Sequence, residues 1–240
     1  MRRSENHNQD HGRGQDRAGR VTENELERRT GRGRPVKFFL VRHGETEWNK
    51  LGRFQGHEDI ELNERGLAQA KETAVSAAHW GHSAIYTSPL IRTRQVADEM
   101  VKVAPVRVVE KDGLKELDLG DLEGVTGEEM RQGWGDIYEA WRAGPHQVSM
   151  PNGESLGQLR ERAWQAILEI EQQHSGDDSV VVISHNFAIR SIIGELLGVP
   201  LENFHRMSLS LASVCTFDSD ERGRRLLTYN STSHLSPENR

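Results

Sequence analysis

The feature that most constrains this chain is an almost wholly apolar run at residues 36–41 that ends abruptly in Arg-His-Gly. Such a run, rich in β-branched and aromatic side chains, is typical of a strand buried on both faces. In open α/β sheets, ligands bind just beyond the carboxyl ends of the strands. We therefore expect Arg42 and His43 to lie at the floor of a crevice, where Gly44 lets the backbone approach a bound ligand.

A second run of this kind, Ser-Val-Val-Val-Ile at residues 179–183, is followed directly by Ser184 and His185. Two strongly apolar strands would thus each end in a histidine, and His43 also has an arginine beside it. A lone histidine is more often structural than catalytic, whereas two at matching strand ends are harder to assign to structure. From their spacing alone, the structural and the catalytic interpretations both stay open.

The pattern between and around these runs alternates strand-like and helix-like segments, which predicts an α/β protein. We expect a three-layer α/β/α sandwich with a mostly parallel central sheet, in a single domain at residues 36–240. Further strands are expected at 84–88 and 106–110, with a closing hairpin at 214–218 and 226–229; helices are expected at 64–80, from Pro89 to about 101, at 156–174 and at 188–197. Residues 114–124 are predicted to be irregular, and residues 125–150 partly helical.

Residues 1–35 differ in composition from the rest of the chain. They hold nine arginines, six acidic residues and almost no apolar side chain apart from Val21 and Leu26. Such a segment buries too little surface to offset the entropy of ordering it. We predict a disordered N-terminal tail, with a basic arm for an acidic partner as the alternative.

Charge and cysteine content exclude several classes of protein. A net charge of −6 argues against a nucleic-acid partner, which requires a basic face. The single cysteine, Cys215, rules out an internal disulfide and a cysteine-based metal site, and fits a reducing compartment. No apolar run approaches the roughly 18 residues of a membrane span. We therefore expect a cytoplasmic protein without a membrane partner.

The segment Leu-Val-Arg-His-Gly-Glu-Thr-Glu-Trp-Asn at residues 40–49 closely resembles the signature of the histidine phosphatase superfamily, also called the phosphoglycerate-mutase-like family. The resemblance implies a phosphoric monoester hydrolase that acts on small metabolites through a covalent phosphohistidine on His43. It implies neither a metal nor another cofactor. Arg42 would bind the phosphoryl group, since a guanidinium offers phosphate oxygens a planar fork.

Three further segments extend this resemblance to the other catalytic positions. Residues 87–97 are similar to the element of the family that carries a second phosphate-binding arginine, which falls on Arg92, so that Arg94 is expected to be solvated. Residues 114–124 resemble the segment with the proton donor, which falls on Glu116; from the residues alone, Asp118, Asp121 and Glu123 are equal candidates. Residues 182–190 resemble the segment in which His185 would bond the phosphoryl group.

The substrate-binding positions are less specific. By resemblance, Asn49 belongs to the phosphate pocket, and Gln55 and Gly56 to a substrate loop. His57, together with three aromatic residues, either lines the leaving-group pocket or belongs to a local core; the aromatic residues are Trp134, Tyr138 and Trp141. Residues 151–155 and 230–235 also resemble family elements, so the likeness covers about residues 36–235.

Two other functions remain as alternatives. A phosphoglycerate-mutase-type phosphotransferase would use the same residues, but mutases of the family usually have an extra segment between the acid and the second histidine. Here Glu116 and His185 are only 69 positions apart, which favours the compact phosphatase branch. A phospho-ligand binding or regulatory module without turnover is the other alternative. The partner expected is a small phosphate ester, and the oligomeric state stays open, with a homodimer among the options.

Overall fold

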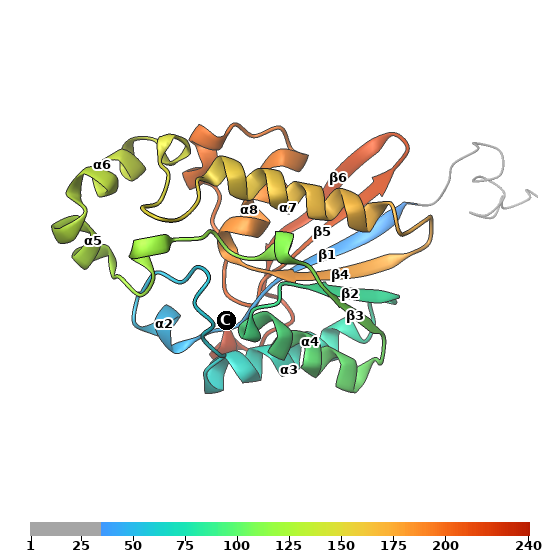
Figure 1. The fold of residues 1–240 in the computed structure, drawn as a ribbon. Coiled ribbons are helices and arrows are strands. Elements are labelled where there is room, and N and C mark those ends of the chain that lie inside the picture. Colours follow the sequence, from blue (N-terminus) through green and yellow to red (C-terminus); the bar gives the residue numbers. More distant parts are fainter. Residues whose placement is uncertain (1–34) are drawn as a thin grey trace, which may run out of the picture. The chain divides into compact units, whose positions relative to one another are not determined.

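A computed structural model describes residues 35–240 of the chain, and the segment predicted to be a disordered tail therefore lies outside the described residues, apart from Pro35. Within them, a six-stranded sheet has the order β3-β2-β4-β1-β5-β6 (Figure 1). The strands are β1 Val36–Arg42, β2 Ala84–Thr87, β3 Arg107–Glu110, β4 Ser179–Ser184, β5 Val214–Asp220 and β6 Gly223–Ser231. β1, β4, β2 and β3 are parallel, whereas β5 is antiparallel to β1 and forms a hairpin with β6. The predicted α/β class is confirmed.

Helices cover both faces of this sheet, as Figure 1 shows. Helices α3 (Glu64–Ala77) and α4 (Ile91–Val103) lie on one face, and α7 (Leu156–Glu171) and α8 (Asn186–Leu196) lie on the other. Val180 and Val182 of β4 belong to the apolar cluster that contains residues of α7 and α8, whereas Val181 and Ile183 belong to the cluster with residues of α3 and α4. Alternate side chains thus enter opposite layers, which is why residues 180–183 are all apolar.

The remaining elements are short. Most of them connect the strands and helices named above, and one follows β6 in the sequence. The short helices are α2 Glu47–Lys50, α5 Gly127–Gly133 and α6 Gly135–Ala143, and short 3₁₀ helices occupy Asp112–Leu114, Gly120–Leu122, Pro145–Gln147, Leu201–Arg206 and Pro237–Asn239. A third apolar cluster, which includes Leu117, Leu122, Met130 and Phe204, lies beneath these segments. The irregular and partly helical segments expected from the sequence are confirmed. None of the described helices is long and apolar enough to cross a bilayer.

The helix starts depend on local caps in two cases and on a distant acceptor in a third. Asn63 caps α3 by accepting a hydrogen bond from the Gly66 N–H, and Ser155 begins α7 with a capping box. The expectation that Pro89 lies in the first turn of α4 is wrong. Pro89 precedes the N-cap Leu90, which is extended, and the first helical N–H is bonded by Asp59 instead (2.5 Å).

Helix α8 begins at Asn186, two residues earlier than predicted, with His185 as its N-cap. The His185 side chain makes no capping hydrogen bond, so the first N–H groups of this helix are available to other acceptors. In the register of the sheet, Arg42 of β1 lies beside Ser184 of β4, and the His43 N–H donates to the Ser184 carbonyl (3.2 Å). The two histidines that follow these strands therefore lie at the same level of the sheet.

Candidate active site

His43 is held at the end of β1 with one ring nitrogen occupied and the other free. Its side chain is buried, and Nδ1 lies 2.7 Å from the carbonyl oxygen of Gly44. A carbonyl only accepts, so we assign the imidazole proton to Nδ1 and the lone pair to Nε2. Nε2 makes no hydrogen bond to any of the described residues. Burial, followed by the charges of Arg92 and Arg42, holds the pKa of His43 well below its ordinary value. The ring is therefore neutral, with a lone pair on Nε2 that is chemically suited to nucleophilic attack.

His185 has the opposite tautomer. Its Nδ1 accepts a hydrogen bond from the Nε–H of Arg92 (3.2 Å), which assigns the proton to Nε2. That Nε2 is buried and has no partner in the described part of the chain. The ring lies 5.2 Å, centroid to centroid, from that of His43. Because a buried donor without an acceptor is costly, this N–H is suited to the oxygen of a bound ligand beside His43.

The site contains two cations, the fully buried Arg92 and the half-buried Arg42. Arg92 is fully buried and donates to two loop carbonyls, those of Gly56 (2.6 Å) and Glu58 (2.8 Å). Arg42 donates to the Leu209 carbonyl, and its Nε is buried without an acceptor. Burial lowers the pKa of each to about 10, so both stay charged at neutral pH. Neither forms an ion pair with a carboxylate among residues 35–240, and this arrangement favours an anionic ligand.

The residues predicted to bind substrate contact this pocket in different ways. Asn49 and Thr46 form a capping box, in which Asn49 Oδ1 accepts a hydrogen bond from the Thr46 N–H (3.1 Å). Asn49 Nδ2 donates to none of the described residues. When the Gln55 amide nitrogen donates to Thr46 Oγ1 (2.6 Å), its oxygen accepts from Arg92 Nη1 (3.2 Å). Gln55 and Gly56 therefore hold Arg92 in position. The half-buried His57 binds the Glu116 carbonyl through Nε2 (2.9 Å).

Gly56 is required by a close approach of two backbone segments. A Cβ at this position would lie 2.3 Å from the Leu117 carbonyl oxygen and 2.3 Å from a carboxylate oxygen of Glu123. The two oxygens of Glu123 accept from the N–H groups of Gly56 (2.9 Å) and His57 (2.6 Å). Glu123 thus joins the loop that holds Arg92 to the segment that carries Glu116.

Glu116 is the buried carboxyl of the site, with 3% of its surface exposed. Its Oε1 accepts from the N–H groups of Leu117 (2.9 Å) and Phe187 (3.0 Å), the second of which belongs to the uncapped first turn of α8. Burial raises the pKa of Glu116, against the opposing effect of these N–H groups and of Arg92 and Arg42. A carboxyl with a raised pKa is suited to proton transfer.

The other acids of this segment have structural partners. Asp118 accepts from the Gly120 N–H (3.0 Å), and Asp121 accepts from the exposed Asn152 amide (3.0 Å). Glu123 binds the loop, as described above. The geometry therefore favours Glu116 over the candidates that the sequence alone left open.

Sequence analysis missed a charged pair that fixes the backbone of this acid. Arg162 of α7 donates to the carbonyls of Lys115 (2.8 Å) and Glu116 (2.6 Å), and it also bonds Gly113 (3.0 Å) and pairs with Glu154. Glu154 lies within the element at residues 151–155 that resembles the family, but no role was inferred for it. The helical pattern of residues 156–174 predicts which face is apolar. It does not predict that Arg162, on the polar face, bonds carbonyl groups of residues 113–116.

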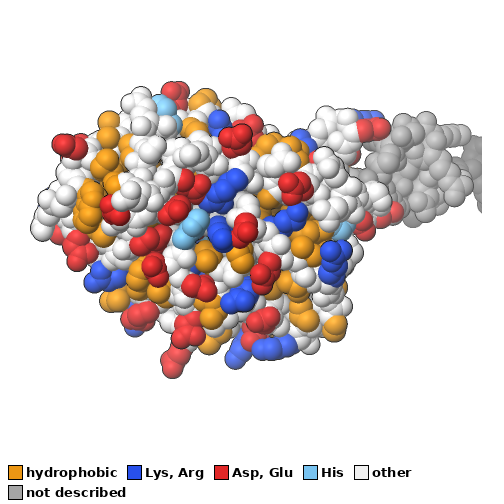
Figure 2. Space-filling model, viewed as in Figure 1, with side chains coloured by type: hydrophobic (Ala, Val, Ile, Leu, Met, Phe, Trp, Pro, Cys, Tyr) orange, Lys and Arg blue, Asp and Glu red, His pale blue; other side chains and the backbone are white. Residues whose placement is uncertain are grey.

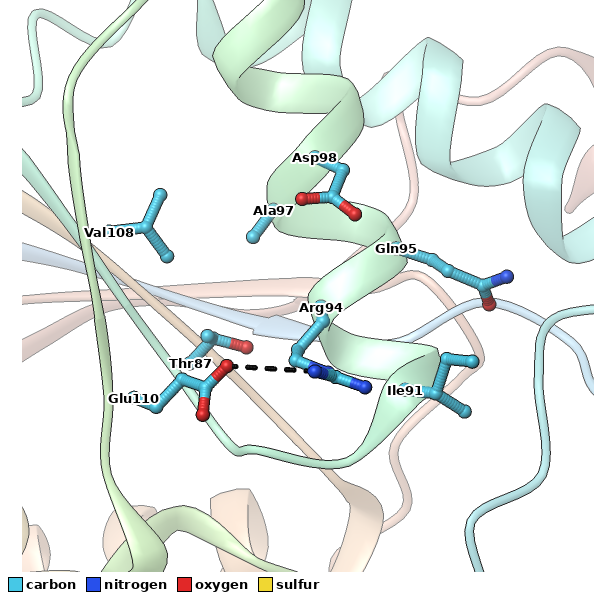
Figure 3. Close-up of a pocket in the computed structure, with 8 residues that line it drawn as sticks. All are labelled: Thr87, Ile91, Arg94, Gln95, Ala97, Asp98, Val108 and Glu110. Atoms are coloured by element: carbon cyan, nitrogen blue, oxygen red, sulfur yellow. Dashed lines mark ion pairs between the residues drawn. The ribbon is translucent and has the colours of Figure 1, made fainter.

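Two further expectations concern residues near the site. Arg94 points into a surface hollow between α4 and β3, where it faces Glu110 at 3.9 Å (Figure 3). It is a surface residue, as expected. Trp134, Tyr138 and Trp141 pack on the third apolar cluster, which favours the local-core alternative for them. The space-filling view shows hydrophobic side chains gathered over the region of α5 and α6 (Figure 2).

Comparisons with known proteins show which sequences and folds this chain is similar to. The model of the histidine phosphatase superfamily (branch 1) matches residues 38–232. Phosphoserine phosphatase 1 of Hydrogenobacter thermophilus is 36% identical over 200 residues, which cover 83% of this chain and 94% of that protein. A 2,3-bisphosphoglycerate-dependent phosphoglycerate mutase of Bartonella quintana is 32% identical over 192 residues, covering 76% and 93%. The structure of Bacillus stearothermophilus YhfR is 26% identical, with a TM-score of 0.79 over 83% of this chain and 98% of that one.

The position of Arg162 generates a first prediction. Arg162→Met removes the donor to three carbonyls around Glu116, so the carboxyl should be displaced, and a displacement of about 1 Å costs about 10²-fold in rate. We expect kcat for an alkyl phosphate to fall by about 10- to 100-fold, with a smaller loss for p-nitrophenyl phosphate, whose leaving group needs little proton transfer. Arg160→Met is the matched control, because Arg160 lies on the same helix as Arg162 but pairs at the surface with Glu195 of α8. Equal losses on both esters would refute the positioning role.

Proposed function

Because this chain belongs to the histidine phosphatase superfamily, we propose that it hydrolyses phosphate monoesters of small metabolites through a covalent phosphohistidine on His43. The observation that carries the proposal is the neutral, buried imidazole of His43. Among residues 35–240, its Nε2 has no hydrogen-bond partner, and the two guanidiniums of its site, Arg42 and Arg92, have no carboxylate partner. Such a site attracts a phosphate dianion and offers it a nucleophile. The fold positions both parts at the carboxyl edge of the sheet.

In the first step, His43 Nε2 attacks phosphorus, and the P–N bond forms as the bond to the ester oxygen breaks. Glu116, protonated, gives its proton to the departing oxygen, so the alcohol leaves neutral. Arg42 and Arg92 balance the charge of the phosphoryl oxygens, and the Nε2–H of His185 donates to one of them. Positioning and charge stabilisation supply most of the rate in phosphoryl transfer.

In the second step, water replaces the alcohol. The Glu116 carboxylate left by the first step takes a proton from the water, whose oxygen attacks phosphorus as the P–N bond breaks. Inorganic phosphate leaves, and His43 and Glu116 return to their starting protonation states. The chemistry of the two steps balances without a metal ion, and no group of three or more His, Cys, Asp or Glu side chains in the described residues is arranged to hold one.

The relatives suggest where to look for a substrate. Phosphoserine is the substrate that one relative's name gives, and we propose it as the first ester to assay. The mutase among the relatives keeps isomerisation as a second candidate function. Release of inorganic phosphate from phosphoglycerate, in place of its isomer, would decide for the phosphatase. The cytoplasmic location expected from the cysteine content and the absence of a nucleic-acid partner expected from the net charge are parts of this proposal.

The phosphoenzyme is the direct test of the proposed function. His43→Ala should abolish turnover and leave the melting temperature nearly unchanged, because the ring contacts the site more than the core. Brief reaction of the wild type with a ³²P-labelled ester should give an acid-labile, base-stable label on His43. Exposed His205→Asn is the control for the substitution. Normal turnover in the alanine variant would end the proposal.

A second prediction concerns the proton that Glu116 supplies. An alkoxide leaves poorly without a proton, whereas a nitrophenolate leaves well, and general acid catalysis is worth about 10²–10⁴ in rate. Glu116→Gln should therefore slow the phosphorylation burst heavily on an alkyl phosphate and much less on p-nitrophenyl phosphate. The steady state must be measured separately, since the hydrolysis step also uses Glu116. A fall by the same factor in both bursts would show that Glu116 is not the acid.

A further inference from the structure

The peptide unit between Gly44 and Glu45 lies beside the proposed nucleophile, and both of its polar groups form hydrogen bonds. Its carbonyl oxygen accepts from His43 Nδ1 (2.7 Å), the contact that assigns the tautomer of the ring. Its N–H donates to Oε1 of Gln69 on α3 (2.8 Å). Because a peptide unit is planar and rigid, the bond to Gln69 also restrains the carbonyl that orients the His43 ring.

Gln69 is a buried amide, and both ends of it have backbone partners. Only 1% of its surface is exposed. Its Oε1 accepts from the Glu45 N–H, and its Nε2 donates to the carbonyl of Asn239 (2.7 Å). A backbone N–H only donates and a carbonyl only accepts, so these partners assign the orientation of the amide. The side chain thus joins the loop after β1 to the 3₁₀ helix Pro237–Asn239.

The far end of this connection is itself anchored on α3. Glu72, one turn after Gln69, accepts from the N–H and the hydroxyl of Ser236 (2.8 and 2.7 Å) and from Asn239 Nδ2 (2.9 Å). These bonds hold the Asn239 carbonyl within reach of Gln69 Nε2. Figure 1 shows the C-terminal end of the chain beside α3. The Gln69 side chain is therefore fixed from both sides.

The backbone of His43 is held separately from its ring. Its N–H donates to the Ser184 carbonyl (3.2 Å), and its carbonyl accepts from the Ala212 N–H (3.0 Å). Within residues 35–240, the ring has a single hydrogen bond, the one to Gly44. A Cβ at Gly44 would lie 3.0 Å from Gln69 Oε1, so the loop packs closely on this amide. The strands fix the backbone of His43, whereas the orientation of its ring depends on the peptide unit that Gln69 holds.

We propose that Gln69 is a positioning residue for the nucleophile: through the peptide unit of Gly44 and Glu45, it maintains the tautomer and the ring orientation of His43. The inference rests on the proposed function and extends it by a residue on α3. Hydrogen bonds in a chain polarise one another, so the bond at the Glu45 N–H makes the Gly44 carbonyl a better acceptor for His43 Nδ1–H. The lone pair then stays on Nε2, from which His43 attacks phosphorus.

Gln69→Leu removes both hydrogen bonds at a similar side-chain volume. The rate at which p-nitrophenyl phosphate phosphorylates the enzyme should fall by about 10- to 100-fold, because a misplaced ring or the wrong tautomer slows the attack. The affinity for inorganic phosphate should change by less than about threefold, since Arg42 and Arg92 keep their own partners. ¹⁵N spectra of the ligand-free variant should show the His43 proton divided between Nδ1 and Nε2.

Gln69→Glu separates positioning from packing. A protonated Glu accepts from the Glu45 N–H and donates to the Asn239 carbonyl, and the carboxylate keeps the first of these bonds. The phosphorylation rate should therefore return to within about fivefold of the wild type at the same pH, and the His43 tautomer should be restored. Gln165→Leu is the matched control, because Gln165 is exposed on α7, and it should change neither quantity.

A folded Gln69→Leu enzyme with the wild-type phosphorylation rate, or with an unchanged His43 tautomer, overturns the inference. Equal losses in phosphorylation rate and phosphate affinity overturn it too, because they assign Gln69 to the fold of the whole site. A folded Gln69→Glu enzyme that is no better than Gln69→Leu is a third contradiction.

The wild type gives a test that needs no substitution. Its Glu45 amide should exchange hydrogen at least about 100-fold more slowly than an exposed amide, because Gln69 is the acceptor of that N–H. Fast exchange of this amide overturns the inference, even if Gln69→Leu does not fold. A wild type without turnover overturns the proposed function, and the comparison of His43 tautomers then decides the role of Gln69 by itself.

Discussion

The rest of the structure depends on one constraint: ionisable side chains, including His43, His185 and Arg92, are buried near the carboxyl ends of the parallel strands β1 and β4. Arg92 shows how this is achieved: it is fully buried, and two loop carbonyls and the ring of His185 accept its hydrogen bonds. Those carbonyls belong to a loop that Glu123 joins to the segment of Glu116. The loop, the acid and the strand ends therefore form one hydrogen-bonded unit, which explains why Arg92, His185 and Glu116 are as buried as core residues.

The same desolvation sets the chemistry. It disfavours the charged form of every group, so it lowers the pKa of His43 and His185 and raises that of Glu116. Nearby guanidiniums strengthen the first effect and oppose the second. The outcome is a neutral imidazole with a free lone pair, a neutral N–H donor and a carboxyl that can hold a proton. All three lie beside cations that have no carboxylate partner among the described residues. A phosphate monoester supplies the charge that this arrangement lacks.

Much of this could be predicted from the sequence because the signals are local. Buried parallel strands are continuous apolar runs, and the residues after them are at the ligand edge, which located His43 and His185. Helix caps such as Asn63 and Ser155 are equally local. Local signals could not single out Glu116 among the four acids of its segment. The position of the Glu116 carboxyl depends on α8 and on Arg162, which are distant in the sequence.

The early start of α8 and the position of Pro89 were missed for a related reason. Asp59 bonds the first N–H of α4, and Glu116 accepts from the first turn of α8, so acceptors far away in the sequence replace the local caps. The helices and strands could largely be predicted from the sequence, whereas the polar contacts between distant segments could not.

The protonation states of the two histidines test the central claim most directly. In ¹⁵N spectra of the imidazoles of the ligand-free enzyme, His43 should show a protonated Nδ1 and a bare Nε2, and His185 the reverse. Both rings should stay neutral well below the ordinary histidine pKa of 6.5. Assignment would use His43→Ala and His185→Ala spectra. An imidazolium signal from either ring that titrates near 6.5 would contradict the account, because the buried cations would then not control the site.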